Sequence, residues 1–117
     1  MNTTPQSLRS NEMTILEHRL ENEAERLRDH IASLKMFGLK ERLPGAADVA
    51  AERDEQLVRR RLTVRRARRA LRRTEAALRR MRDGTFGTCQ RCGKPIDPDR
   101  LRVVPTATTC VACADGD

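Results

Sequence analysis

Aromatic side chains are almost absent from this chain of 117 residues, which has no tryptophan, no tyrosine and two phenylalanines, Phe37 and Phe86. With 38% hydrophobic and 35% charged residues, the composition favours long helices packed along narrow seams over a thick core. An uninterrupted apolar run of about 18 residues is also lacking, so we expect no transmembrane helix and no membrane partner. The N-terminal segment has no apolar signal-peptide core, which predicts a cytoplasmic protein.

The sequence also lacks the motifs of common enzymes, because it has no glycine-rich phosphate loop, no nucleophile elbow and no paired catalytic carboxylates. We therefore expect a protein that is not an enzyme. Charge is present in excess but is unevenly distributed. Residues 1–56 carry 8 basic and 11 acidic residues, and residues 57–117 carry 16 basic and 6 acidic residues, for a net charge of +7. The surplus positive charge suits an acidic protein surface or phosphates.

Two long helices are predicted from apolar residues that recur every seven positions. Residues 1–10 are polar and are expected to be disordered. The first helical pattern begins near Asn11 and stops at Leu43-Pro44-Gly45, because proline cannot donate the helix hydrogen bond. Its apolar stripe consists of Met13, Leu16, Leu20, Ala24, Leu27, Ile31, Leu34 and Phe37.

The second helical pattern begins near Asp48, a suitable N-cap, and ends at Asp83-Gly84. Its stripe consists of Leu57, Val64, Ala67, Leu71, Thr74, Leu78 and Met81. Neither helix can bury its stripe alone, so the sequence predicts a mainly α fold, with an antiparallel two-helix coiled-coil hairpin over residues 11–83 and a tip loop near 38–50. The alternative is a homodimer in which each stripe packs on its own copy, but the short connecting loop favours the hairpin.

All four cysteines lie at the end of the chain, in the pairs Cys89-Gln90-Arg91-Cys92 and Cys110-Val111-Ala112-Cys113. This spacing suits one tetrahedral Zn²⁺, and four thiolates leave no open position for a catalytic water. Residues 84–117 are therefore predicted to form a small module around one structural Zn²⁺. Its expected apolar cover consists of Phe86, Ile96, Leu101 and Val103. The alternatives are a redox-active dithiol pair or a disulfide.

Arginines are concentrated in the second helix, where twelve occur between Arg59 and Arg82. They are available for phosphate contacts, which give nucleic-acid affinity without sequence choice, or for an acidic protein groove. The alternative is a solvated face that the glutamates of the first helix partly neutralise.

The stretch DGTFGTCQRCGKPIDPDRLRVVPTATTCVAC, residues 83–113, resembles the DksA/TraR family of bacterial four-cysteine zinc-finger transcription factors. The coiled-coil hairpin that precedes it extends the resemblance to most of the chain. The resemblance implies a regulator that binds RNA polymerase directly, with the hairpin in the secondary channel, its tip near the catalytic centre and the finger at the rim.

The same resemblance implies roles for particular residues. Asp48 and Ala50 match two positions of the family's acidic tip, Asp-x-x-Asp-x-Ala, whose first Asp is Gly45 here. Arg66 and Arg73 match basic positions of the family's ppGpp site, but Val104 and Ala114 replace two other basic residues, which argues against ppGpp sensitivity. The arginines that we expect to contact the polymerase channel or rim are Arg65, Arg66, Arg69 and Arg73.

Two other functions remain open from the sequence. The arginine-rich helix is compatible with a protein that binds nucleic acid directly, although we regard direct DNA binding as the weaker interpretation. The four thiolates are also compatible with a redox sensor that loses zinc on oxidation.

Overall fold

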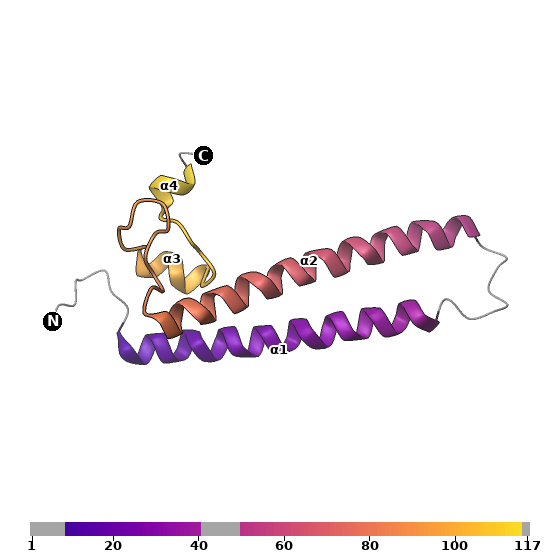
Figure 1. The fold of residues 1–117 in the computed structure, drawn as a ribbon, viewed down its shortest axis with the longest axis horizontal. Coiled ribbons are helices and arrows are strands. Elements are labelled where there is room, and N and C mark those ends of the chain that lie inside the picture. The colour runs from indigo at the N-terminus through magenta and orange to yellow at the C-terminus, as the bar shows by residue number, and fades with distance from the viewer. Residues whose placement is uncertain (1–8, 41–49, 116–117) are drawn as a thin grey trace. The chain divides into compact units, whose positions relative to one another are not determined.

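The computed structural model describes residues 9–40 and 50–115, with side chains described over 9–36 and 54–114. Two long helices dominate it, α1 over Ser10–Lys40 and α2 over Ala50–Asp83 (Figure 1). Two short helices follow, α3 over Pro98–Val103 and α4 over Val111–Asp115. The described residues include no named β-strand, only an isolated antiparallel bridge between Thr88 and Pro95. The predicted mainly α fold is confirmed.

By their contacts, the residues group into two compact units that each contain part of α1 and part of α2. The root unit joins the residues up to Asn22 with those from Arg73 onward, and the distal unit comprises Glu23–Arg72. Within each unit the two helix segments run in opposite directions (Figure 1). This is the antiparallel arrangement that the two heptad stripes predicted.

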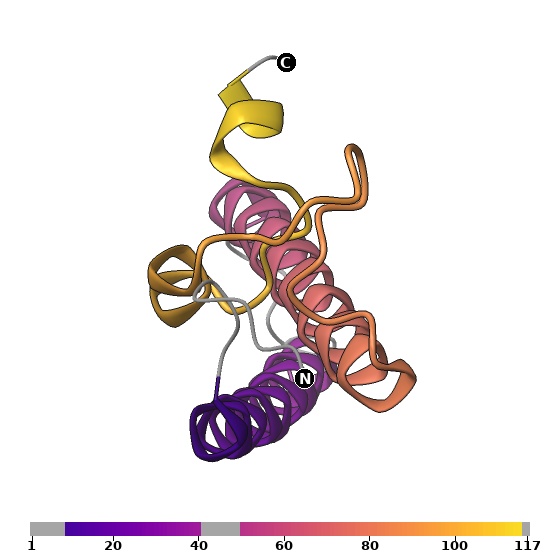
Figure 2. The same cartoon turned by 90° about the vertical axis from the view of Figure 1, so that its left-hand side faces the viewer.

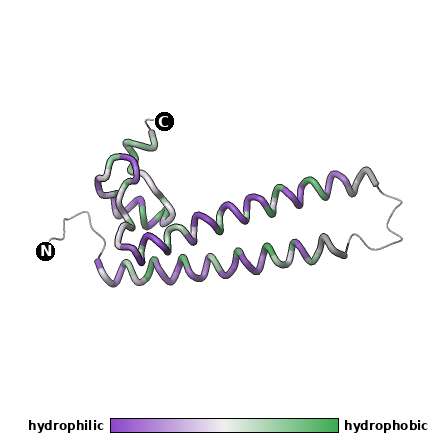
Figure 3. Tube along the Cα trace, viewed as in Figure 1, coloured by the Kyte–Doolittle hydropathy of each residue, from purple (hydrophilic) through white to green (hydrophobic). Residues whose placement is uncertain are grey.

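The distal unit is held by a narrow seam of small and medium-sized side chains. Ala24, Ile31 and Ala67 are buried there. The neighbouring seam residues, Leu27, Leu34, Leu57, Val64 and Leu71, are only partly buried. Hydrophilic residues otherwise cover much of this part of α2 (Figure 3). In a seam between two helices each side chain packs against one partner helix, so part of its surface stays in contact with water.

The root unit has a more substantial core. Leu20, Ala77 and Leu78 form a buried cluster against which Met81 and Phe86 pack. In Figure 2 the finger segment, residues 84–115, lies at the end of this unit where α1 begins and α2 ends. Phe86 also packs against the buried cluster of the finger. One aromatic ring therefore joins the helix pair to the finger.

The first helix extends beyond the residue at which its pattern weakens. We expected a tip loop from residue 38, whereas α1 includes Gly38 and ends at Lys40. A single glycine inside a helix costs only about 1 kcal/mol relative to alanine, so the helix continues through it. Phe37 of the predicted stripe lies outside the residues whose side chains are described. No helix of the described residues is long and apolar enough to cross a membrane.

Candidate zinc centre

The first cysteine pair lies on a turn that folds back on itself after α2. Two glycines with positive φ shape this turn, Gly87 at 84° and Gly93 at 77°, a backbone region that side chains disfavour. A Cβ at Gly87 would also lie 3.3 Å from Cδ1 of Leu101. The backbone N–H of Cys89 donates to Lys94 O at 2.8 Å and that of Ile96 donates to Gly87 O at 2.7 Å. Glycine at position 87 is therefore favoured by the backbone conformation, and a side chain there would also crowd Leu101.

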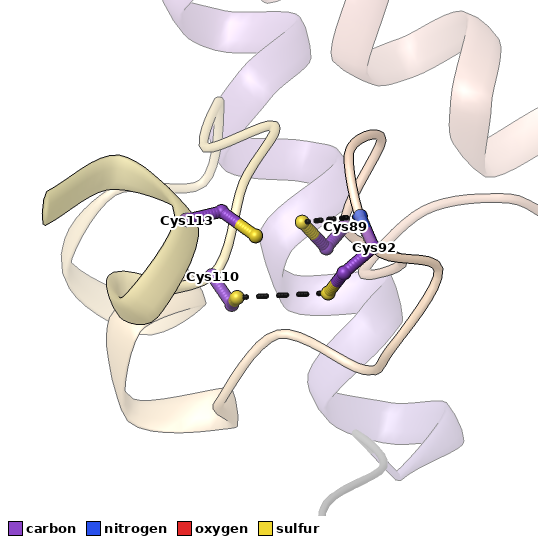
Figure 4. Close-up of side chains that lie close together, drawn as sticks. All are labelled: Cys89, Cys92, Cys110 and Cys113. Atoms are coloured by element: carbon purple, nitrogen blue, oxygen red, sulfur yellow. Dashed lines mark hydrogen bonds between the residues drawn. The ribbon is translucent and has the colours of Figure 1, made fainter. Parts of the chain in front are cut away.

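The turn directs two backbone N–H groups at the first sulfur. Arg91 N lies 3.4 Å and Cys92 N lies 3.5 Å from Sγ of Cys89, and Figure 4 shows the second of these contacts. Hydrogen bonds of this kind stabilise a thiolate over a thiol. The local sequence thus prepares Cys89 to be a metal ligand.

The second cysteine pair, at the start of α4, completes the set. The four Sγ atoms all lie within 4.8 Å of one another, and those of Cys92 and Cys110 are 3.8 Å apart (Figure 4). Zn–S bonds of about 2.3 Å place tetrahedral sulfurs under 4 Å apart, so this spacing suits one Zn²⁺. No disulfide joins these cysteines. The four thiols are positioned to bind one metal ion, as the spacing predicted.

The protein environment moves the pKa values of two of these thiols in opposite directions. Hydrogen bonds from the backbone N–H of Cys92, and then of Cys110 and Arg91, lower the pKa of Cys89 to about 6, against the opposing effect of burial. Contacts with the thiols of Cys110 and Cys89, together with burial, raise the pKa of Cys113 to about 12. Metal-bound thiols are deprotonated. The chain's own hydrogen bonds thus favour the thiolate at Cys89, whereas deprotonation of Cys113 near neutral pH requires a bound metal ion.

A small apolar core supports the four sulfurs. Cys89, Ile96, Leu101 and Ala107 are buried together, with Phe86 packed against them. This confirms Phe86, Ile96 and Leu101 as apolar cover, but the prediction for Val103 is wrong, because that side chain is 78% exposed. Val103 ends α3 and faces solvent, and Ala107 fills the core instead.

Three arginines of the finger make tertiary contacts that sequence reasoning did not identify. Arg100 Nε donates to Thr109 O at 3.1 Å and Arg91 Nη1 donates to Cys113 O at 3.4 Å. These contacts tie α3 and the first cysteine turn to the second cysteine pair. The sequence gives little indication of these contacts, because both arginines donate to backbone carbonyl oxygens, which every residue carries.

The third arginine, Arg102, joins the finger to α1. Its Nη2 lies 2.7 Å from Oε2 of Glu12, and its backbone O accepts from Arg19 Nη1 at 3.1 Å. Arg102 also pairs with Asp99. The hydrogen bond from Arg102 is the main cause that lowers the pKa of Glu12 below its usual value, with a second contribution from Arg9. We call Glu12, Arg19 and Arg102 the root clasp.

Comparison with known proteins agrees with this geometry. Residues 84–117 match the family model described as the prokaryotic DksA/TraR C4-type zinc finger. The solved structure of the transcription factor DksA2 from Pseudomonas aeruginosa superposes with a TM-score of 0.84 and 26% identity, over 97% of this chain and 88% of that one. The finger, residues 84–117, is thus a DksA/TraR C4-type zinc finger, and the chain shares the fold of DksA2.

Curated DksA/TraR relatives match in sequence over shorter stretches. The RNA polymerase-binding transcription factor DksA of Caulobacter vibrioides is 44% identical over 46 residues, which is 39% of this chain and 32% of that protein. The protein of the same name from Escherichia coli K12 is 34% identical over 70 residues, which is 60% of this chain and 46% of that protein. The aligned part thus spans less than half of either relative. A C4 finger with four convergent sulfurs is a zinc site, and the predicted cofactor is confirmed.

The proposed roles of the other predicted site residues stay predictions, and each residue is located only within its own part of the chain. Asp48 lies outside the described residues, and Ala50 is the first residue of α2, with its side chain not described. Arg65, Arg66 and Arg69 are exposed on α2 in the distal unit. Arg73 and Val104 are exposed in the root unit. The aliphatic Val104 is thus presented to solvent where the family resemblance predicts a basic residue.

Proposed function

We propose that this protein is a transcription regulator that binds RNA polymerase through the secondary channel. The hairpin tip approaches the catalytic centre, and binding modulates initiation. The observation that carries the proposal is the match of 97% of the chain to the transcription factor DksA2. Curated relatives that are named RNA polymerase-binding transcription factors support the same partner. The zinc site has a structural role, because four cysteine ligands leave no position for a substrate.

The physical properties of the helices support this mode of binding. A helix rises 1.5 Å per residue, so the 31 and 34 residues of α1 and α2 give elements of about 45 and 50 Å. Helices of this length suit insertion into a deep channel. The exposed arginines 65, 66, 69 and 73 are proposed to contact the channel or its rim. Arginine is well suited to this role because its planar guanidinium binds carboxylates in a bidentate manner.

Direct binding to the purified core enzyme tests the proposal. The full chain, loaded with zinc and treated with nuclease, is expected to bind RNA polymerase, and a protein or inhibitor that fills the secondary channel is expected to displace it. A chain that does not bind the core enzyme would contradict the proposal. Binding that survives a filled channel would move the contact to another surface of the polymerase.

The proposed tip role of Asp48 is tested separately. Asp48→Asn removes the negative charge with little change in size, so we expect polymerase affinity to change less than about twofold, while the effect on initiation is lost. Asp54→Asn, a change at an exposed residue of α2, is the matched control and should keep full activity. Promoter-complex lifetimes with and without each variant provide the measurement. Normal regulation by Asp48→Asn would show that the tip assignment is wrong.

A further inference from the structure

An outer stripe on α2 combines exposed aliphatic and cationic residues. Val58 and Leu62 are 54% and 42% exposed. They lie four positions apart, and Arg65 and Arg69 follow at seven and eleven positions from Val58. Residues at these spacings share one side of a helix. All four lie in the distal unit, and we call Val58, Leu62, Arg65 and Arg69 the outer stripe.

The outer stripe lies on the side of α2 that faces away from α1. Ala67, which is buried in the seam, is two positions from both Arg65 and Arg69, and two positions turn about 200° round a helix. Val64 has the same relation to Leu62 and is partly buried. The side chains of the outer stripe therefore take no part in the coiled-coil seam.

Arg65 and Arg69 are not neutralised by the rest of the described chain. Neither guanidinium makes an ion pair or a side-chain hydrogen bond with another described residue. Three of the six acidic residues of α1 have other partners: Glu21 pairs with His18, Glu23 with Arg26 and Glu12 with Arg102. For Arg65 and Arg69, this observation argues against neutralisation by glutamates of α1. The two charges remain available to a partner.

We propose that the outer stripe is a docking site for a protein surface that has an apolar groove bordered by carboxylates. Amphipathic helices bind such grooves through side chains at these spacings, and arginine is enriched among the residues that dominate protein interfaces. A phosphate backbone would engage the arginines but would gain nothing from Val58 and Leu62, whose burial requires an apolar partner. The mixture thus favours protein over nucleic acid. The proposal rests on the proposed function, because it assigns this groove to RNA polymerase.

Paired substitutions in the full zinc-loaded chain test the outer stripe against matched controls. Val58→Ala with Leu62→Ala keeps helix propensity and is expected to weaken polymerase binding about tenfold or more. Met36→Ala is the apolar control, because Met36 is 59% exposed on α1 of the same unit. Arg65→Gln with Arg69→Gln should weaken binding similarly and reduce its salt dependence. Arg59→Gln with Arg68→Gln, two exposed arginines outside the stripe, is the charge control.

The outcomes separate the two proposals. If the parent chain does not bind polymerase, both the proposed function and the docking site are wrong. If the parent binds and the stripe variants bind no worse than their controls, only the docking site is wrong. Equal losses from both arginine pairs, with no loss from Val58→Ala and Leu62→Ala, would identify unspecific electrostatics and overturn the proposal. Salt-sensitive binding of the parent to a random-sequence DNA duplex, insensitive to the aliphatic changes, would replace the protein partner by nucleic acid.

Discussion

The two units of this protein are stabilised in different ways. Among the described side chains of the distal unit, Ala24, Ile31 and Ala67 are buried, and the other seam residues are partly exposed. The root unit adds a compact core around Ile96 and Leu101 and four sulfurs arranged for a metal. A long seam can be built from heptad repeats alone, whereas a finger of about thirty residues has too little apolar surface to fold without its ion.

Removal of zinc should produce the largest difference in stability between the two units. Structural zinc contributes about 10–16 kcal/mol in zinc-finger peptides, so a strong chelator, or Cys110→Ser, should unfold the finger. The helicity lost should be close to that of α3 and α4, 6 and 5 residues long, because the distal seam contains no zinc ligand. Circular dichroism and amide exchange of the full chain would measure both units. If zinc removal abolished amide-exchange protection in both units together, the two units would not be separately stabilised.

Truncation of one buried side chain in each unit sharpens the comparison. Leu101 and Ile31 are 2% and 8% exposed, and such Leu or Ile to Ala changes cost about 2–5 kcal/mol. Leu101→Ala should weaken zinc binding, because Leu101 packs in the same cluster as Cys89. Ile31→Ala should lower the melting temperature and leave zinc affinity unchanged. Competition with a chromogenic chelator measures the zinc affinity of each variant. Equal zinc affinities for Leu101→Ala and Ile31→Ala would contradict the packing argument.

The smallest expected effect concerns the root clasp. Glu12→Gln removes the charge that Arg102 contacts, at a partly exposed surface site where ion pairs contribute little. The pKa of Glu12 is lowered from 4.5 in the folded chain, so its contribution is complete above that value and is lost as pH falls through the folded pKa. The difference in melting temperature from the parent should therefore be present at pH 7 and shrink below pH 4.5. Glu25→Gln, at an exposed glutamate of the distal unit, is the control and should show neither change.

Much of the fold follows from local pattern. The heptad positions from Leu16 to Ile31 and from Ala67 to Leu78 are buried, apart from Leu27 and Leu71, which are partly buried. Their spacing predicted this burial. The two CxxC pairs identified the sulfurs that the structure brings together. These features can be read from the sequence because helix periodicity and ligand spacing depend on residues close together in the chain.

The sequence by itself determined the two apolar stripes and the four zinc ligands, since each depends on a short repeat or a fixed local spacing. Only the tertiary structure decided that Val103 faces solvent while Ala107 is buried, and that Arg102 meets Glu12, which lies 90 residues earlier. It also decided that the two arginines of the outer stripe make no ion pair with another described residue. These outcomes depend on how separate segments pack against one another, and the periodic spacing of residues along the chain does not reveal that packing.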